Sequence, residues 1–446
     1  MRQTVMYSKR IRERCRVFQD TAAVYRAVLT YLIDVCVSEW DAVKGIRSSV
    51  YRQAYIEKLI HHTAKRPLVR YEDFDTRFYK LPSYLRRGAV SKALGIVSPY
   101  MRSLENWYAE DPKERGQKPG YPKAGYSFPC MYRMDMYREN GPYSAKIKVY
   151  IRNTWDWISV SLRKSDADYI QRHCDVLEES ALVLQKRGKC WYLDFAYTGE
   201  YELRNVSDYQ GTIIAAVDLG LNNAAAVSIM CHDGTVLGRE FLKLPCETDC
   251  LRHAVNRIRK AQQHGAGKTP RLWAIADGIN DDISVKTAQF IIDTAIKYNA
   301  DVIVMEHLDS GGKKHGSKKQ RLHLWKSQYV QSMAELKAHR HGIRVSRVNA
   351  WGTSRLAYDG SGPVLRGKES EKTRNNYSLC EFTTGKVYNC DLNASYNIGA
   401  RYFVREITKS LPVRERLRLE AKVPSACKRS TCTLSTLISL NAVLAA

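Results

Sequence analysis

Three acidic residues in this chain of 446 residues each stand at the edge of an apolar or helix-forming run. Asp218 ends the apolar run in IIAAVDLGLNN, Glu306 ends the one in DVIVMEHLD, and Asp391 precedes the helix-forming run in YNCDLNASYNIGARY. Carboxylate oxygens are the ligands that Mg²⁺ prefers, and Mg²⁺ keeps room for water and phosphate. Two such ions stabilise the attacking and the leaving oxygen when a phosphodiester is cut. The three acids therefore predict a divalent-metal phosphodiesterase site.

Each acid, taken alone, also fits a structural role. Asp218 is followed by Gly220 and by two asparagines, which fits an ordinary turn after a buried strand. Glu306 fits the first solvated residue after a central strand. Asp391 precedes a helical stretch from Asn393 to about Phe403, where an Asp is most often an N-cap. The prediction of a catalytic site therefore depends on the three segments together.

The three segments occur in the order, and with the neighbouring residues, of one known family. The chain resembles the transposon-encoded TnpB RNA-guided endonucleases and the related compact type V CRISPR effectors in AAVDLGLNNAAAVS, VIVMEHLDS and CDLNASYNIGAR. Between the second and third motifs, it also resembles them in Arg321, Trp325 and the stretch Glu335–Arg355. The resemblance implies a RuvC nuclease domain of RNase H-like fold that uses Mg²⁺ or Mn²⁺. The catalytic and metal-binding residues that it implies are Asp218, Glu306 and Asp391, with Glu306 holding mainly one of two ions.

The segment that carries the first two acids has the pattern of an α/β domain. Two apolar runs around the Asp218–Asn223 turn predict an antiparallel strand pair, and further elements lead to the strand that ends at Glu306. This order agrees with an RNase H-like domain. The predicted elements are strands Ile213–Val217, Ala224–Met230 and Val236–Leu242 and helices Leu251–Gln263 and Asp282–Tyr298.

The resemblance also implies a zinc ribbon after Thr353, and here the sequence departs from the family. The family has two Cys-x-x-Cys pairs, whose thiolates hold one tetrahedral Zn²⁺. The first pair falls on Ala357 and Gly360, and only Cys380 and Cys390 stand near the third acid. We therefore expect no zinc site. Two turn sequences persist and predict a small hairpin module held by packing, at 358–362 and 383–386.

Residues 1–205 have the pattern of a strand, then helices, then strands again. A long helix with Pro99 as a kink precedes a linker rich in Pro, Gly and Lys, and a later hairpin turns at Arg187-Gly188. The resemblance implies a wedge-like β-barrel interrupted by a helical recognition lobe. The predicted elements are strand Arg2–Tyr7, helices Asp20–Trp40, Tyr51–His62 and Ser83–Trp107, the irregular connection His62–Arg77, the linker Glu110–Gly125, and strands Ala145–Ile151 and Asp156–Leu162.

The predicted fold class is a multidomain α+β protein. It has an N-terminal wedge-like β-barrel interrupted by a helical recognition lobe, then an RNase H-like (RuvC) α/β nuclease domain with a small ribbon-like insert. The predicted domains are a first wedge-like strand (1–17), a helical recognition lobe (18–115), a wedge-like β domain (116–205), a first nuclease part (206–350), a degenerate ribbon (351–390), a second nuclease part (391–425) and a C-terminal tail (426–446).

The charge of the chain suits a nucleic-acid partner. Seventy-one Lys and Arg against 46 Asp and Glu give a formal charge of +25, enough to neutralise many phosphates. Twenty-eight Tyr and eight Trp offer faces for base stacking, although more than half of the aromatic residues are expected in cores. The glycine-and-lysine loop 310–321 either touches a phosphate backbone or is a solvated loop. The candidate nucleic-acid contacts are Lys9, Arg10, Arg12, Lys313, Lys314, Lys318, Lys319, Arg321 and Trp325.

The sequence predicts a cytoplasmic, reducing setting with no membrane partner. Met1–Arg16 lacks the apolar core of a secretory signal, and Thr433–Ala446 is too short and too interrupted to span a bilayer. Twelve Cys in a chain of this length do not make a dense disulfide framework and are expected to be mostly core thiols. Whether the protein acts alone, as a homodimer or with a protein partner stays open.

The resemblance implies an RNA-guided, Mg²⁺-dependent DNA endonuclease. A guide RNA selects the target double-stranded DNA by base pairing, while the protein reads a short flanking motif. Two other functions stay open. A TnpB-like RNA-guided DNA-binding regulator with weak or no cleavage normally lacks one of the acids. A guide-independent RuvC-like nuclease or resolvase would not need the long N-terminal half.

Overall fold

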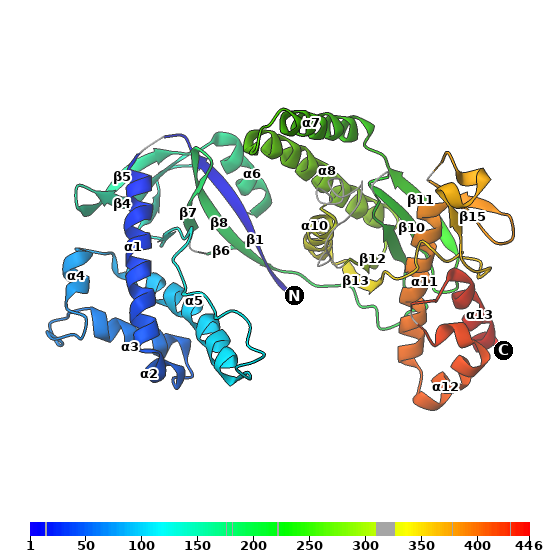
Figure 1. Cartoon of the computed structure of the whole chain (residues 1–446), viewed down its shortest axis with the longest axis horizontal. Helices are drawn as coiled ribbons and strands as arrows, with labels where there is room; N and C mark the ends of the chain where they lie inside the picture. The colour runs from blue at the N-terminus through cyan, green and yellow to red at the C-terminus, as the bar shows by residue number, and fades with distance from the viewer. Residues whose placement is uncertain are drawn as a thin grey trace. The chain divides into compact units, whose positions relative to one another are not determined.

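The computed structural model describes residues 1–13, 16–174, 176–180, 182–220, 223–308, 326–376, 378–428 and 430–446. The chain divides into two compact units, one of residues 2–200 and one of residues 201–446 together with Met1. In Figure 1 the first unit is coloured blue to green and the second green to red. The boundary lies close to the predicted start of the nuclease part at residue 206, and the finer domain limits stay predictions.

The first unit contains two antiparallel sheets. The predicted hairpin is confirmed, and its turn places Gly188 at a φ of 59°. In the described residues the two sheets meet in a bridge between Ile11 and Leu162, so a closed barrel is not confirmed. In sheet order the strands are β1 (Arg2–Ile11), β8 (Cys190–Glu200), β7 (Leu182–Arg187) and β2 (Cys130–Met131), with β6 (Glu178–Glu179) beside β8, and then β3 (Tyr137–Glu139), β4 (Ser144–Ile151) and β5 (Thr154–Ser161).

Helices occupy the middle of this unit's sequence, as predicted. The first of them begins at Arg16, before the predicted Asp20, and its apolar side is buried against α5 and β4. By length and composition alone this helix could cross a membrane, but half of that stretch is buried inside the protein, as in a core helix. The helices are α1 (Arg16–Ser38), α2 (Trp40–Lys44), α3 (Ser49–Ile60), α4 (Asp73–Arg77), α5 (Ser83–Ala109) and α6 (Lys164–Cys174).

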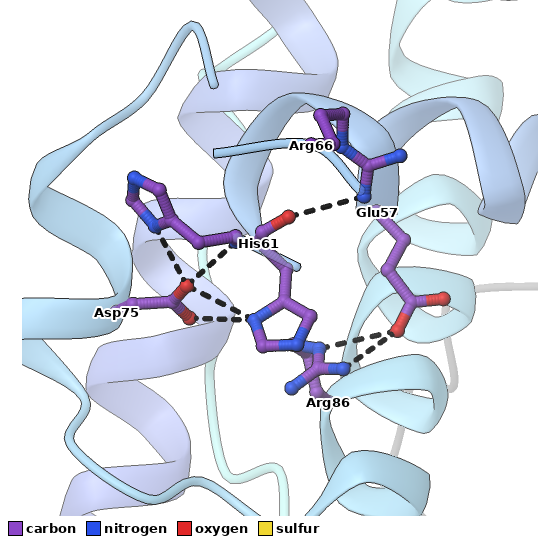
Figure 2. Close-up of polar contacts among 6 residues, drawn as sticks. Glu57, His61, Arg66, Asp75 and Arg86 are labelled. Atoms are coloured by element: carbon purple, nitrogen blue, oxygen red, sulfur yellow. Dashed lines mark hydrogen bonds and ion pairs between the residues drawn. The ribbon is translucent and has the colours of Figure 1, made fainter. Parts of the chain in front are cut away.

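A polar cluster connects α3, α4 and α5 (Figure 2). The Asp75 carboxylate lies 2.9 Å from Nδ1 of His61 and 3.0 Å from Nδ1 of His62, and it accepts the backbone N–H of His62 at 2.9 Å. Nearby, Arg86 donates from Nε and Nη2 to Glu57, at 3.1 and 3.0 Å. Burial raises the pKa of Asp75, but the hydrogen bonds from His62 and His61 outweigh it and hold that pKa below its usual range. Asp75 is therefore a charged acceptor that fixes the end of α3.

Asp75→Ala is expected to destabilise the protein by about 1–3 kcal/mol at neutral pH, because partly buried donors lose a charged acceptor. The folded-state pKa of Asp75 lies below its unfolded value, so this stabilisation is present above about pH 4 and is lost as the pH falls through the folded pKa. Thermal unfolding at pH 7 and pH 3 measures both effects. Glu72→Ala, an exposed acid at the start of the same helix, is the control. Equal losses in the two variants would contradict the prediction.

The second unit is built on a five-stranded mixed sheet in the order β11-β10-β9-β12-β13. The strands β9, β10 and β11 are antiparallel neighbours, whereas β12 runs parallel to β9 and β13 runs parallel to β12. The strands predicted from Ile213 to Leu242 are confirmed within one residue at their ends. Their bounds are β9 (Ile214–Asp218), β10 (Ala225–Met230), β11 (Val236–Leu242), β12 (Val302–His307) and β13 (Arg344–Asn349).

Helices cover both faces of this sheet (Figure 1), because successive strand side chains point to opposite faces. Ala215 and Val217 of β9 pack with α8 and α10, whereas Ile214 and Ala216 pack with α11 and α13. The helices predicted at Leu251–Gln263 and Asp282–Tyr298 are confirmed. Both begin earlier than expected, and each has a Pro in its first turn. The helices are α7 (Pro245–Gln263), α8 (Pro270–Lys297), α10 (Ser327–Arg340), α11 (Cys390–Ser410), α12 (Val413–Lys422) and α13 (Leu434–Ala445), with a 3₁₀ turn η3 (Pro424–Ala426) before α13.

At Gly399, α11 approaches the sheet so closely that no side chain fits. A Cβ at this position would lie 2.4 Å from Sδ of Met230 and 3.2 Å from Cβ of Ala216. Gly399→Ala is therefore expected to push α11 away from the sheet and to destabilise the protein by about 1–3 kcal/mol, as thermal unfolding would show. Gly278→Ala on α8 is the matched control, because a Cβ there meets nothing within 4 Å. A Gly399→Ala protein as stable as the parent would contradict this packing.

The predicted hairpin module of the degenerate ribbon is confirmed. Its three short antiparallel strands enclose a core of buried apolar side chains, and the predicted turn glycines Gly360 and Gly385 have φ values of 80° and 81°. The elements are β14 (Leu365–Arg366), the 3₁₀ turns η1 (Gly367–Glu369) and η2 (Glu371–Thr373), β15 (Leu379–Glu381) and β16 (Val387–Asn389). The core residues are Ala357, Val364, Cys380, Phe382 and Cys390.

An aromatic cluster joins this module to α11. The ring of Tyr358 lies 5.5 Å from that of Phe382, 5.1 Å from Tyr388 and 5.3 Å from Tyr396. Nζ of Lys386 lies 4.9 Å from the centre of the Tyr358 ring and donates to its hydroxyl at 2.7 Å. Edge-on aromatic pairs and a cation over their faces are each stabilising. Packing therefore holds the module together, as expected, and also joins it to α11.

Candidate active site

Asp218 and Glu306 lie beside each other at the ends of two parallel strands. The register pairs Val304 with Ala216 and Met305 with Val217, so the next residues, Glu306 and Asp218, are neighbours. Val304 and Ala216 face α11, and alternation puts Glu306 and Asp218 on that same face. The sheet therefore presents two carboxylates toward the start of α11.

Asp391 is the second residue of α11, and it is not the N-cap. The cap is Asn389, whose Oδ1 accepts the backbone N–H of Asp391 and of Leu392, both at 3.0 Å. The carboxylate of Asp391 instead accepts a hydrogen bond of 2.5 Å from Nδ2 of Asn223, a buried residue. The N-cap interpretation of Asp391 is therefore wrong, because Asn389 already satisfies the free N–H groups of the helix start.

Asp218 lies within the electrostatic influence of the other two acids. Burial raises the pKa of Asp218 well above its usual range, and the charges of Glu306 and Asp391 raise it further, while Arg366 opposes them. Burial also raises the pKa of Glu306, against the hydrogen bond from Thr353 and the charge of Arg401. Adjacent carboxylates in a poorly solvated place need positive charge to stay ionised. The site therefore favours a cation.

The chemistry of these donors fits a hard divalent cation such as Mg²⁺, which binds carboxylate oxygens. Within the described ranges, no group of three His, Cys, Asp or Glu side chains is already arranged to hold a metal ion. In the described residues, Asp218 and Glu306 thus lie at strand ends and Asp391 at a helix start, but their side chains are not already arranged around a metal position. The degenerate ribbon lacks such a group within the same ranges, and Cys380 and Cys390 there are free, buried thiols.

Three functional candidates were not predicted from the sequence. Asn223 belongs to the turn after the first acid, Thr353 begins the connection to the ribbon, and Arg401 ends the third motif. The hydroxyl of Thr353 is hydrogen-bonded to Oε1 of Glu306. Each of the three lies within or next to a segment that resembles the family, and this was the sequence signal that could have marked it. The residues that they contact, however, lie far away in the sequence.

The predicted nucleic-acid contacts differ in how exposed their side chains are. Arg12 is exposed, and Arg10 is partly exposed with its backbone N–H bonded to Asp166 at 3.0 Å. Lys9 is the exception: its side chain is 9% exposed, and Nζ lies 4.8 Å from the centre of the Phe195 ring. Lys9 therefore contributes to the sheet's own packing, and its contact with nucleic acid stays a prediction. The other predicted contacts lie outside the described residues: Lys313, Lys314, Lys318, Lys319, Arg321 and Trp325.

Comparison with known proteins gives two family matches. Residues 328–398 match the model of the Cas12f1-like TNB domain, and residues 5–151 match the model of the Aq_aa04 family. A curated relative, the uncharacterized protein aq_aa04 of Aquifex aeolicus (strain VF5), is 34% identical over 90 residues. That match covers 20% of this chain and 49% of the relative, so the chain spans about half the length of this relative.

Solved structures align with most of this chain, and one of them shows the same fold. The Cas12f1 chain of a Cas12f1-sgRNA-target DNA complex aligns with a TM-score of 0.53 and 15% identity, over 86% of this chain and 81% of that one. CasPhi-2 (Cas12j) bound to crRNA and phosphorothioate-DNA aligns over 88% of this chain and 90% of that one, with a TM-score of 0.47 and 10% identity. The sequence-based resemblance to TnpB-like proteins and compact type V effectors is confirmed by the TNB match and the Cas12f1 fold.

Proposed function

We propose that this chain, a TnpB-like protein with the fold of the compact type V effectors, is an RNA-guided DNA endonuclease that hydrolyses phosphodiesters at Asp218, Glu306 and Asp391. One observation carries the proposal. Asp218 and Glu306, far apart in the sequence, are neighbours at one end of the sheet, and Asp391 opens the helix that covers this face, near enough for its charge to raise the pKa of Asp218. A purely structural role for each acid would not require them to meet.

The sheet topology supports a RuvC-type, RNase H-like domain. Three antiparallel strands followed by two parallel ones, with helices on both faces, form the order that this fold class was expected to have. Asp218 ends the first strand, Glu306 is next to the end of the fourth, and Asp391 opens the helix that packs across them. This arrangement fits the roles that the resemblance assigns to the three acids.

The three acids would bind the metal ions of this reaction. Asp218, Glu306 and Asp391 would hold Mg²⁺ or Mn²⁺, and these ions when bound supply an activated water and neutralise the phosphate. Asn223 orients the carboxylate of Asp391 from the turn after the first acid. The residues thus offer carboxylate oxygens for the cations, one of them held in place by Asn223.

A guide RNA and a target double-stranded DNA are the proposed partners. The similar Cas12f1 structure was solved with an sgRNA and a target DNA, and this chain carries a formal charge of +25. The large first unit favours a guided enzyme over a bare resolvase, and the presence of all three acids favours cleavage over binding alone. Sequence choice would then come from base pairing with the guide.

Co-expression with the noncoding DNA that flanks its gene tests this proposal. RNA that copurifies with the protein is sequenced, and the complex is mixed in Mg²⁺ with plasmids that carry the matching target next to randomised flanks. We expect one discrete RNA species and depletion of plasmids with one short flanking motif. If no discrete RNA copurifies, the guided function is wrong. Discrete RNA with tight target binding but no cleavage would favour the regulator.

A further inference from the structure

Three buried polar side chains lie on one face of α11, four residues apart. Asn393 and Asn397 are fully buried, and Arg401 is 4% exposed. Residues spaced by four stack along one side of a helix. Buried amides and guanidinium groups are costly unless they are hydrogen-bonded, so their partners define what this face does.

All three side chains bond to the same stretch of backbone, residues 349–358. Asn393 donates to the carbonyl of Leu356 at 2.8 Å, and its Oδ1 accepts the N–H of Tyr358 at 2.8 Å. Asn397 donates from Nδ2 to the carbonyl of Thr353 at 3.0 Å and to that of Leu356 at 2.8 Å. This stretch connects β13 to the ribbon module, and α11 holds it in one place.

Arg401 bonds to the N-terminal part of the same stretch, 349–358. Its Nη1 donates to the carbonyls of Asn349 at 2.7 Å and Trp351 at 2.8 Å, and its other nitrogens donate to Ser430 and Cys432, at 2.5 and 3.2 Å. Among the described residues no carboxylate lies within ion-pair distance of this buried guanidinium. Its charge nevertheless reaches Glu306 and opposes the rise that burial causes in the pKa of that acid.

The segment held in this way carries Thr353, which is 2% exposed. The Thr353 hydroxyl lies within hydrogen-bonding distance of Oε1 of Glu306 and, at 3.0 Å, of the carbonyl of Ala350. A hydroxyl has one proton to give, and the charged acceptor makes the stronger hydrogen bond. The backbone of Glu306 is fixed separately, since its carbonyl accepts Nε2 of Gln331 at 2.7 Å.

We propose that Thr353 is a positioning residue for Glu306, and that Asn397 and Arg401 of α11 hold Thr353 in place. This inference rests on the proposed function, because Glu306 is positioned for metal binding. The hydroxyl fixes one oxygen of Glu306 and leaves the other for a cation. The helix that brings Asp391 to the site thereby also sets the orientation of Glu306, so the third motif acts on two of the three acids.

Thr353→Val removes the hydroxyl at nearly constant volume, and Thr353→Ser keeps it. Loss of an outer hydrogen bond to a metal ligand typically costs about 10–100-fold in metal affinity or activity. In the guide-bound protein, we expect Thr353→Val to weaken Mn²⁺ binding, followed by calorimetry, about 10-fold or more. The half-saturating Mg²⁺ concentration for DNA cleavage should rise by a similar factor. Thr353→Ser should restore both values to near those of the parent.

Thr408→Val is the matched control, since Thr408 lies further along α11 and bonds only to helix carbonyls in the described structure. Asn397→Ala removes the amide that bonds the Thr353 carbonyl and should reproduce the metal defect, with the double variant no worse than Thr353→Val alone. Thermal unfolding and guide-RNA binding are measured for every variant. They separate a metal defect from loss of the fold.

The outcomes separate this inference from the proposed function. If Asp218→Ala abolishes cleavage but Thr353→Val binds Mn²⁺ and cuts like the parent, the positioning role is overturned and the proposed function stands. The role is also overturned if Thr353→Val lowers only the unfolding temperature, or if Thr353→Ser fails to restore metal binding. If Asp218→Ala cuts as well as the parent, the proposed function itself fails.

Discussion

Asp218→Ala is expected to abolish target cleavage while leaving guide-RNA and target-DNA binding intact. Asp218 ends β9 beside Glu306 and faces α11, so its removal takes away a carboxylate that no described neighbour replaces. A loss of several kcal/mol of transition-state stabilisation corresponds to a rate decrease of about 10³-fold or more. Single-turnover cleavage of a matched plasmid, with filter binding of RNA and DNA in parallel, measures the two effects separately.

Asp293→Asn is the matched control for this variant, because Asp293 is an exposed acid on α8. It removes one negative charge without touching the three acids and should cut like the parent. Cleavage by Asp218→Ala at more than about one tenth of the parent rate would contradict the assignment of the site. Loss of RNA binding together with cleavage would point to a folding defect, which thermal unfolding would detect.

Chelation of divalent metal is expected to stop cleavage completely without unfolding the ribbon module. The proposed mechanism needs a cation at the three acids, whereas the module is held by a buried apolar core and by the rings around Tyr358. A zinc-dependent ribbon would lose its fold with its metal. We therefore expect EDTA to abolish activity, Mg²⁺ alone to restore it at once, and the unfolding temperature to stay nearly constant throughout.

Metal analysis of the purified protein provides the control for that prediction. The account predicts well below one zinc per chain and the same unfolding curve in EDTA and in buffer. Stoichiometric zinc, or activity that returns only after Zn²⁺ is added, would contradict the metal-free ribbon. Cleavage that persists in EDTA would instead contradict the metal-dependent site.

The core strands of the second unit could be predicted because their sequence pattern is local. The strand Val236–Leu242 has the predicted limits. The strands β9 and β10, on either side of the turn after Asp218, differ from the predicted limits by at most one residue at each end. Buried strands in such sheets are continuous apolar runs with polar residues where they stop. The same pattern marked Asp218 and Glu306 as candidates. That the two acids are neighbours could not be predicted from the sequence near each of them, because it depends on how β9 and β12 pair.

Other features depend on contacts between distant segments. The Asp391 N-cap alternative failed because Asn389, two residues earlier and an equally favoured N-cap residue, is the cap. Lys9 was a candidate nucleic-acid contact by its charge alone, and the sequence did not reveal that its side chain packs against Phe195. Thr353 and Arg401 are ordinary polar residues until the fold brings them to Glu306 and to the 349–358 backbone. Tertiary packing, rather than propensity, decided these positions.

The most direct test of the account compares two plasmids that differ only in the sequence complementary to the copurified RNA. Both carry the same flanking motif, and both are incubated with the parent complex in Mg²⁺. The account predicts that the matched plasmid is cut and the scrambled one is left intact, with no cutting of either by Asp218→Ala. Equal cutting of both plasmids by the parent complex would contradict RNA guidance, and cutting by Asp218→Ala would contradict the three-acid site.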